Sequence, residues 1–189
     1  SITNTGTADD QPEGFELEVG PSSLILKCGD TAGAFYGLRA IQQLVRQYGP
    51  ILPVMRIRDW PDFRARGIML DISRDKVPRL STLFELVEKL SEWRINQFQL
   101  YTEHTFAYLG HSEVWRNASP MSAADIRALD AFCRDRFIDL VPNQNSFGHF
   151  ERWLRHPRYR PLAEAPDGFD LPWGGRREVG TTLDRKSVV

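Results

Sequence analysis

The sequence feature that most constrains the fold is the stretch from Arg66 to Arg74, which reads Arg-Gly-Ile-Met-Leu-Asp-Ile-Ser-Arg. Its apolar residues lack helical spacing, a pattern that favours a strand buried on both faces, as in a parallel sheet. Asp71, Ser73 and Arg74 stand at its carboxyl end, where parallel α/β sheets bind their ligands. The same charges could instead solvate the ends of an ordinary strand, and the stretch alone leaves both interpretations open.

Two further strands with intervening helices repeat this arrangement along the chain. We expect the strands over residues 96–101 and 138–142. The helices between them carry capping-box patterns, one at Thr82-Leu-Phe-Glu85 and one at Ser122 and Asp125. This order of elements predicts parallel strands joined by right-handed crossovers. The expected inner helical faces are Leu83, Leu86, Val87, Leu90 and Trp93 in the first helix, and Ile126, Leu129 and Cys133, joined by Phe132 or Phe137, in the second.

The first part of the chain has a different pattern, which predicts a small α+β unit. Apolar and polar residues alternate over residues 15–19, as in a strand with one solvated face. A turn follows, so the next strand is expected to pair with the first as an antiparallel hairpin. The expected elements are strands over residues 15–19, 24–28 and 54–57, and a helix capped by Asp30 or Thr31, with apolar positions Ala34, Leu38, Ile41, Leu44 and Val45, that ends at Gly49-Pro50.

The two ends of the chain lack a clear periodic pattern. Residues 1–12 are expected to be a disordered or cut end, and residues 157–189 contain many Pro, Gly and Arg residues. Three parallel strands and two helices are too few to close an eight-stranded barrel. We therefore expect the chain to stop before its fold does.

Composition narrows the class of protein. The chain has 189 residues, is 41% hydrophobic and carries a net charge of −1, so it can bury a core and offers no broad footprint for nucleic acid. No apolar run approaches membrane-spanning length, and the polar first residues do not form a signal peptide, which leaves the compartment open between cytoplasmic and secreted. Two cysteines are too few for a disulfide framework, and Cys133 is expected in the core.

Candidate ligand-binding residues gather at the ends of the expected strands. Glu103 and His104 follow the second strand, Asn145 and His149 follow the third, and Arg66 lies at the start of the first. Adjacent parallel strands end at the same edge of a sheet, so we expect these groups to share one binding rim. Carboxylate, imidazole, amide and guanidinium groups together suit a polyhydroxylated ligand.

Each of these candidates also has a plainer interpretation. Glu103 and His104 could bind a metal, but neighbouring side chains on a strand point apart and no third ligand has suitable spacing. Since no glycine-rich phosphate loop is present either, we expect no cofactor. The plainer roles for the rest are a helix cap for His149, an ion pair with Asp62 for Arg66, and a core or lid position for Trp115 and Trp153.

The segments that carry these residues resemble those of a known family. In their order and spacing they are similar to family 20 glycoside hydrolases, the β-N-acetylhexosaminidases. The resemblance implies that residues 1–57 are part of a zincin-like α+β accessory domain and that residues 58–189 are the first three strands of a (β/α)8 catalytic barrel. The segments are residues 15–19, Ala32-Gly-Ala-Phe-Tyr-Gly-Leu38, Gln42-Gln-Leu44, Ile57-Arg-Asp-Trp-Pro-Asp-Phe63, residues 66–74 and Pro142 to His149.

The resemblance also implies an activity, the hydrolysis of terminal non-reducing β-linked N-acetylglucosamine or N-acetylgalactosamine. In this family the 2-acetamido oxygen of the substrate attacks the anomeric carbon, and an Asp–Glu pair after the fourth strand assists. No Asp–Glu pair follows any of the three expected strands, so we expect the pair beyond residue 189 and this chain alone to be inactive. A non-catalytic carbohydrate-binding module and a barrel hydrolase with another proton donor are two competing hypotheses.

The resemblance assigns roles to the candidate residues. Arg66 matches the arginine that holds the 3- and 4-hydroxyls of the sugar, and His149 matches a histidine near the catalytic carboxylates. Glu103 or His104 falls where the family has an acidic residue. Asn145 falls where many members have aspartate, which removes a charge near the catalytic pair. The oligomeric state is left open.

Overall fold

The computed structural model of the chain describes residues 2–3 and 11–187, and these form two compact units. The first unit comprises residues 1–66, 88–96 and 136–138, and the second comprises the remaining segments. Along the chain, the first break between the units thus follows Arg66, whereas the domain boundary after residue 57 stays a prediction from resemblance.

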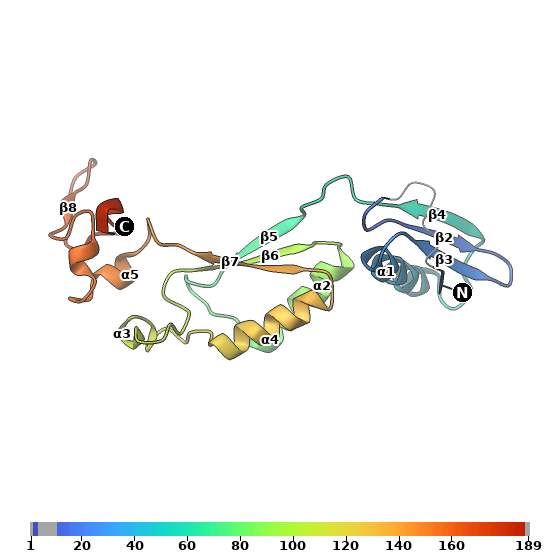
Figure 1. Ribbon diagram of the computed structural model, residues 1–189, viewed down its shortest axis with the longest axis horizontal. Helices are drawn as coiled ribbons and strands as arrows, with labels where there is room; N and C mark the ends of the chain where they lie inside the picture. Colours follow the sequence, from blue (N-terminus) through green and yellow to red (C-terminus); the bar gives the residue numbers. More distant parts are fainter. Residues whose placement is uncertain (1, 4–10, 188–189) are drawn as a thin grey trace. The chain divides into compact units, whose positions relative to one another are not determined.

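The first unit contains a four-stranded, mostly antiparallel sheet (Figure 1). The predicted hairpin is confirmed, because β2 pairs antiparallel with β3 and with β4. Ile2 and Thr3 form a short strand parallel to β3, so the expectation of a disordered end is wrong there, while residues 1 and 4–10 lie outside the described residues. In sheet order the strands are β1 (Ile2–Thr3), β3 (Leu24–Cys28), β2 (Phe15–Val19) and β4 (Met55–Asp59).

One helix, α1 (Thr31–Tyr48), packs on this sheet. Asp30 caps it, since one carboxylate oxygen accepts from the backbone N–H of Gly33 at 2.6 Å. The buried side of α1 contains two glycines, and a Cβ on Gly33 would lie 2.2 Å from the backbone oxygen of Gly14. The small residues therefore allow close packing, while the expected apolar positions Leu38 and Val45 are exposed. The core comprises Phe15, Leu17, Val19, Leu26, Cys28, Tyr36 and Ala40.

The second unit contains a parallel three-stranded sheet, as predicted (Figure 1). Its strands are β5 (Gly67–Asp71), β6 (Gln97–Thr102) and β7 (Asp139–Gln144), in that order. The crossovers contain α2 (Leu80–Glu92) and α4 (Ala123–Arg134). Asp71 pairs with Tyr101, and Tyr101 pairs with Asn143, so the carboxyl ends of the three strands are level.

One face of this sheet is covered by helices. Phe98 and Leu100 of β6 are buried, and Phe84 of α2 stacks on Phe132 of α4 with ring centroids 4.5 Å apart. The expectation that the first strand is buried on both faces is wrong for the described chain, because Met69 is 58% exposed. The fold class is thus a mixed α/β fold with an antiparallel sheet followed by a parallel one.

Of the two predicted capping boxes, one is confirmed and the other is wrong. The capping box at Ser122 and Asp125 is confirmed, with both reciprocal hydrogen bonds present. The box at Thr82 is wrong, because α2 begins two residues earlier and Thr82 lies inside its first turn. Trp93, expected on the inner face, lies just beyond the end of α2 and is exposed, whereas Cys133 is fully buried as expected.

The segment after β7 folds into short elements instead of one long loop. Phe150, Trp153, Leu154 and Tyr159 form its core together with Val114. No helix among the described residues is both long and apolar enough to cross a membrane. The remaining elements are α3 (Ser112–Trp115), α5 (Glu151–Leu154), the 3-10 turns η1 (Arg160–Leu162) and η2 (Arg185–Ser187), and the hairpin of β8 (Phe169–Asp170) with β9 (Arg176–Arg177).

Candidate functional site

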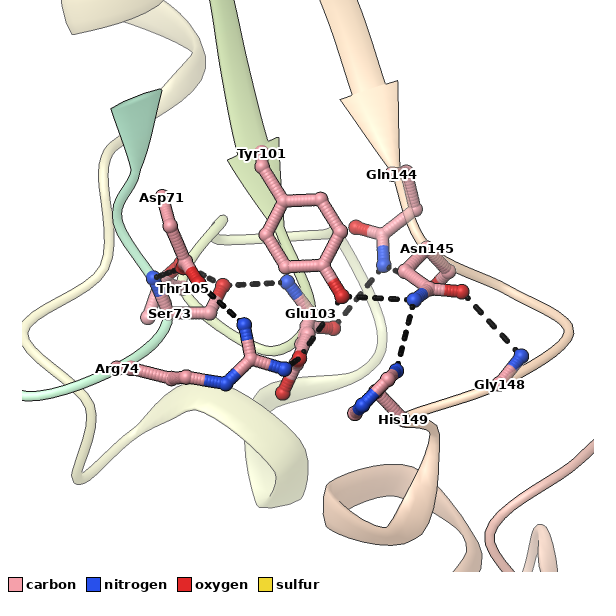
Figure 2. Close-up of polar contacts among 10 residues, drawn as sticks. All are labelled: Asp71, Ser73, Arg74, Tyr101, Glu103, Thr105, Gln144, Asn145, Gly148 and His149. Atoms are coloured by element: carbon pink, nitrogen blue, oxygen red, sulfur yellow. Dashed lines mark hydrogen bonds and ion pairs between the residues drawn. The ribbon is translucent and has the colours of Figure 1, made fainter. Parts of the chain in front are cut away.

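Polar side chains from all three parallel strands meet at the carboxyl edge of the sheet (Figure 2). The guanidinium of Arg74 donates to Glu103 Oε1 at 2.7 Å and also to the carboxylate of Asp71. Tyr101 Oη donates to the same Glu103 oxygen at 2.9 Å and accepts from Asn145 Nδ2 at 2.7 Å. A continuous chain of hydrogen bonds therefore joins the three strand ends.

The loop after β5 is held in place by backbone hydrogen bonds. Ser73 N–H donates to Asp71 Oδ1 at 2.8 Å, so the aspartate shapes the turn that presents Arg74. Ser73 Oγ accepts from the backbone N–H of Glu103 at 2.6 Å and lies 3.2 Å from Thr105 Oγ1. The arginine and the glutamate are thus fixed relative to each other by the backbone as well as by their ion pair.

Trp153 supports the glutamate through its backbone. The indole Nε1 donates to the backbone oxygen of Glu103 at 2.5 Å, and Gln144 Nε2 donates to the same oxygen at 3.1 Å. The ring is buried and stacks on Phe150 with centroids 5.1 Å apart and planes 6° apart. This favours the core interpretation of Trp153 over that of a sugar-stacking platform.

His149 lies next to Asn145, at the end of the network that β7 supplies. Its φ of 52° is in the left-handed region, which turns the chain sharply into α5. Its Nδ1 lies 3.4 Å from Asn145 Nδ2, and the amide oxygen of Asn145 accepts from Gly148 N–H at 3.3 Å. The N-cap residue of α5 is Phe150, and no side-chain capping hydrogen bond is present there among the described residues, so a capping role for His149 is not observed.

Several of these side chains border a pocket of about 680 Å³. From the network just described, Ser73, Arg74, Glu103 and His149 line it, and the β8–β9 hairpin lines it as well, with Trp173 81% exposed. The pocket is open and mixes charged, polar and aromatic groups. Its lining includes Ser73, Arg74, Glu103, His149, Arg152, Phe169, Trp173 and Arg177.

The structure brings together three of the five predicted site residues: Glu103, Asn145 and His149. His104 belongs to the same edge but lines other cavities, as expected for neighbours on an extended segment. Burial, reinforced by the positive charge of Arg152, lowers the pKa of His104.

Arg66, in contrast, is not part of this cluster. It precedes β5, at the amino end of the strand, and its Nε and Nη1 donate to the backbone oxygens of Arg94 and Phe63 at 2.6 and 2.7 Å. Its remaining amino group pairs with Glu13 instead of the predicted Asp62. The arginine that the structure places beside Glu103 is Arg74.

The described residues include no group of three or more His, Cys, Asp or Glu side chains that could hold a metal ion. Glu103 is occupied by Arg74 and Tyr101. What the arrangement offers a ligand is a set of fixed hydrogen-bond donors and acceptors, which is the chemistry that recognises hydroxyl and amide groups.

Comparisons with known proteins show which proteins the chain is similar to. Residues 1–60 match the family model for glycosyl hydrolase family 20, domain 2. The β-hexosaminidase subunit beta of Rattus norvegicus is 29% identical over 153 residues, which are 75% of this chain and 28% of that protein. The N,N'-diacetylchitobiase of Vibrio harveyi is 30% identical over 107 residues, or 56% of this chain and 11% of that protein. The matched part of the chain thus spans less than a third of each of these two relatives.

Solved structures match over nearly the whole chain. A β-hexosaminidase mutant of Streptomyces plicatus, in complex with its product GlcNAc, has a TM-score of 0.76 at 19% identity. The match covers 99% of this chain and 42% of that protein's chain. An exo-β-N-acetylglucosaminidase of Vibrio harveyi, in complex with N-acetylglucosamine, has a TM-score of 0.81 at 17% identity. The match covers 99% of this chain and 34% of that protein's chain. These likenesses show the fold alone.

Sequence and fold together then identify the family. The chain is related to the glycosyl hydrolase family 20 β-hexosaminidases, and residues 1–60 match the domain 2 model of that family.

Proposed function

We propose that this chain supplies part of the sugar-binding site of a β-N-acetylhexosaminidase. The proposed reaction is hydrolysis of terminal non-reducing β-linked N-acetylglucosamine or N-acetylgalactosamine by substrate-assisted retaining catalysis. In this proposal residues 58–189 are the first part of a (β/α)8 barrel, and residues 1–57 belong to an accessory domain. The observation that carries it is the network of Arg74, Glu103, Tyr101 and Asn145 beside the open pocket.

Arg74 is the proposed sugar-binding arginine, in place of Arg66. Its side chain is 46% exposed towards solvent, and only some of its five N–H groups are used by Asp71 and Glu103. The rest are available to sugar hydroxyls. The carboxylates hold the guanidinium in one orientation before a ligand arrives, which reduces the entropy lost on binding.

The proton donor is proposed to come from a segment other than the three strand ends. Glu103 accepts hydrogen bonds from Arg74 and Tyr101, an arrangement that suits a positioning residue. An acid for the leaving-group oxygen needs a carboxylic acid that faces the scissile bond. We therefore expect the Asp–Glu pair of the whole protein to perform this step, with Asn145 and His149 beside it.

Binding of GlcNAc to the 189-residue chain tests the proposal. Calorimetry or ligand-observed NMR should detect saturable binding that Arg74→Gln weakens by about tenfold, as expected for loss of charge-assisted hydrogen bonds. Arg127→Gln is the matched control, because it removes the same charge from an exposed position of α4. Absence of binding by the unsubstituted chain would contradict the proposal.

A chromogenic N-acetylglucosaminide tests the assignment of the proton donor. The 189-residue chain should bind this substrate without turnover, whereas the whole protein should hydrolyse it. Turnover by the chain alone would show that its own residues supply the acid. Binding without hydrolysis by the whole protein would identify a carbohydrate-binding module instead.

A further inference from the structure

The β8–β9 hairpin presents an apolar strip to the pocket that contains Arg74. Phe169, Leu171 and Trp173 line this pocket, whereas Asp170 and Pro172 between them do not. Every second residue thus faces the pocket, as in an extended segment with one side turned towards it. Phe169 and Leu171 are partly buried, but Trp173 is 81% exposed. The indole therefore leaves a large apolar face for a ligand to cover.

A tight turn fixes the position of Trp173 in the hairpin. The N–H of Gly174 donates to the backbone oxygen of Leu171 at 3.0 Å, which closes a β-turn with Pro172 and Trp173 in its middle. Proline sets its own φ in advance, and glycine is favoured at the last position of such a turn. The sequence Leu-Pro-Trp-Gly thus encodes a turn that presents the indole ring.

The base of the hairpin is also held in place. A Cβ on Gly168, whose φ is 83°, would lie 2.1 Å from the backbone oxygen of Arg177, so the two strands approach closely. Arg177 Nη1 donates to Glu151 Oε2 of α5 at 3.1 Å. A ring that is presented from a braced hairpin loses little entropy when a ligand covers it.

The charges that line this pocket indicate a neutral ligand. Arg74 pairs with Glu103 at 2.7 Å, and Arg177 pairs with Glu151 at 3.1 Å. Among the described residues, the arginines and the acidic side chains of the lining are equal in number, so their charges cancel. They are Arg74, Arg152, Arg177, Asp75, Glu103 and Glu151. A neutral sugar has hydroxyls for the polar side of such a pocket and C–H faces for the apolar strip.

Size and exposure indicate where a second sugar ring would lie. The volume of about 680 Å³ falls within the range of about 300–1,000 Å³ that holds drug-sized ligands, and a disaccharide is a ligand of that size. Glu103 is only 7% exposed, whereas Trp173 is 81% exposed. When a terminal sugar is removed, that sugar binds at the enclosed end and the rest of the ligand points to solvent. The network of Arg74 and Glu103 thus suits the terminal ring, and the exposed strip suits the ring after it.

We propose that Phe169, Leu171 and Trp173 form a subsite for the sugar on the leaving-group side. The substrates are then oligosaccharides in which the second ring is also a neutral sugar. The indole of Trp173 covers the C–H face of that ring, while its hydroxyls stay hydrated. This assignment rests on the proposed function, because the network at the strand ends has to hold the terminal sugar.

Calorimetry with two ligands tests the subsite on the 189-residue chain. Methyl β-N-acetylglucosaminide and N,N'-diacetylchitobiose share the terminal sugar and its β linkage, but only the second has another ring. The disaccharide should bind about tenfold more tightly, because it also covers the apolar strip. Equal affinities would overturn the subsite and leave the proposed function standing. Absence of binding by both ligands would contradict the proposed function as well.

Variants locate the gain in affinity. Trp173→Ala should weaken disaccharide binding by about tenfold and leave binding of the methyl glycoside within about twofold, while Trp173→Phe should keep part of the gain. Trp173 is exposed, so both variants should keep the fold, which circular dichroism checks. Trp93→Ala is the matched control, because Trp93 is 66% exposed and does not line this pocket. An unchanged disaccharide affinity in Trp173→Ala, or an equal loss for both ligands, would overturn the proposal.

Discussion

Arg74 Nη2 lies 2.7 Å from Glu103 Oε1, and this ion pair joins the loop after β5 to the end of β6. The same glutamate oxygen accepts the hydroxyl of Tyr101, whose ring lies 5.5 Å from the guanidinium carbon of Arg74. A cation that is held by a carboxylate and by an aromatic face has few orientations open to it. The site is therefore ordered before it meets a ligand.

Arg66 and Arg74 flank β5, and replacing each by glutamine should affect different properties. One variant should mainly lose GlcNAc binding and the other should mainly lose stability. Arg74→Gln should weaken GlcNAc binding by about tenfold and lower the free energy of unfolding only slightly, because the guanidinium is half-exposed and Tyr101 still donates to Glu103. Arg66→Gln should leave binding unchanged but lower the free energy of unfolding by about 1–3 kcal/mol, because the bonds to Glu13, Phe63 and Arg94 are lost.

Calorimetry with GlcNAc and urea denaturation of both variants check this pair of expectations. Since both substitutions remove one positive charge, each is the control for the other. A selective loss of GlcNAc binding in Arg66→Gln would show that Arg66, and not Arg74, contacts the sugar.

The contrast between these arginines shows what the sequence could and could not predict. Apolar periodicity is a local property, so the three parallel strands and the hairpin were predictable. The gathering of polar candidates at the carboxyl ends of the strands was also predictable, because parallel α/β sheets place their ligand-binding groups there. Arg74 satisfies that rule and Arg66 does not. The signal for Arg74 was thus present in the same motif, but the resemblance alone favoured Arg66.

Other details depend on packing that no local pattern encodes. Met69 and Trp93 have the pattern of buried residues but are exposed, since burial depends on what else is packed against them. The buried face of α1 uses Gly33 and Gly37 because the sheet approaches closely, and hydrophobicity patterns give glycine little weight. The burial of His104 Nδ1 without a hydrogen-bond partner among the described residues likewise follows only from three-dimensional placement.

Trp153 should contribute more through its ring than through its indole N–H. Trp153→Phe removes the donor to the Glu103 backbone oxygen, but Gln144 still donates to that oxygen, so the cost should be about 1 kcal/mol. Trp153→Ala also removes the stacking on Phe150 and should cost about 3–5 kcal/mol. Urea denaturation measures both. Equal losses in the two variants would mean that the hydrogen bond dominates.

Gly33→Ala should destabilise the first unit although alanine favours helices. A Cβ at this position would lie 2.2 Å from the backbone oxygen of Gly14, which cannot move as a side chain can. The expected cost is about 1–3 kcal/mol, larger than the helix propensity gained. Gly148→Ala is the control, because no atom of the described residues lies within 4 Å of a Cβ there, and its stability should change by less than about 0.5 kcal/mol. Thermal unfolding of the two variants is compared, and a stabilised Gly33→Ala would disprove the close approach.

Glu88 should make part of the stability depend on pH. Burial tends to raise the pKa of its carboxyl, but hydrogen bonds from Arg136 Nε at 2.7 Å and Arg39 Nη2 at 2.5 Å outweigh burial and lower the pKa below its ordinary value of 4.5. A carboxyl with a lowered pKa in the folded state binds a proton less readily than in the unfolded state. Its stabilisation is therefore complete above about pH 4.5 and is lost as the pH falls through the folded value.

Glu88→Gln should reveal this contribution. At pH 7 it should lower the free energy of unfolding by only about 1 kcal/mol, because solvent screens a partly exposed pair. At pH 3 the difference from the unsubstituted chain should narrow, since that chain has then lost much of the same interaction. Glu85→Gln, at an exposed position of the same helix, should show little difference at either pH. Urea denaturation at pH 7, 5 and 3 gives the comparison, and a difference that stays constant with pH would show that Glu88 acts through packing and not through its charge.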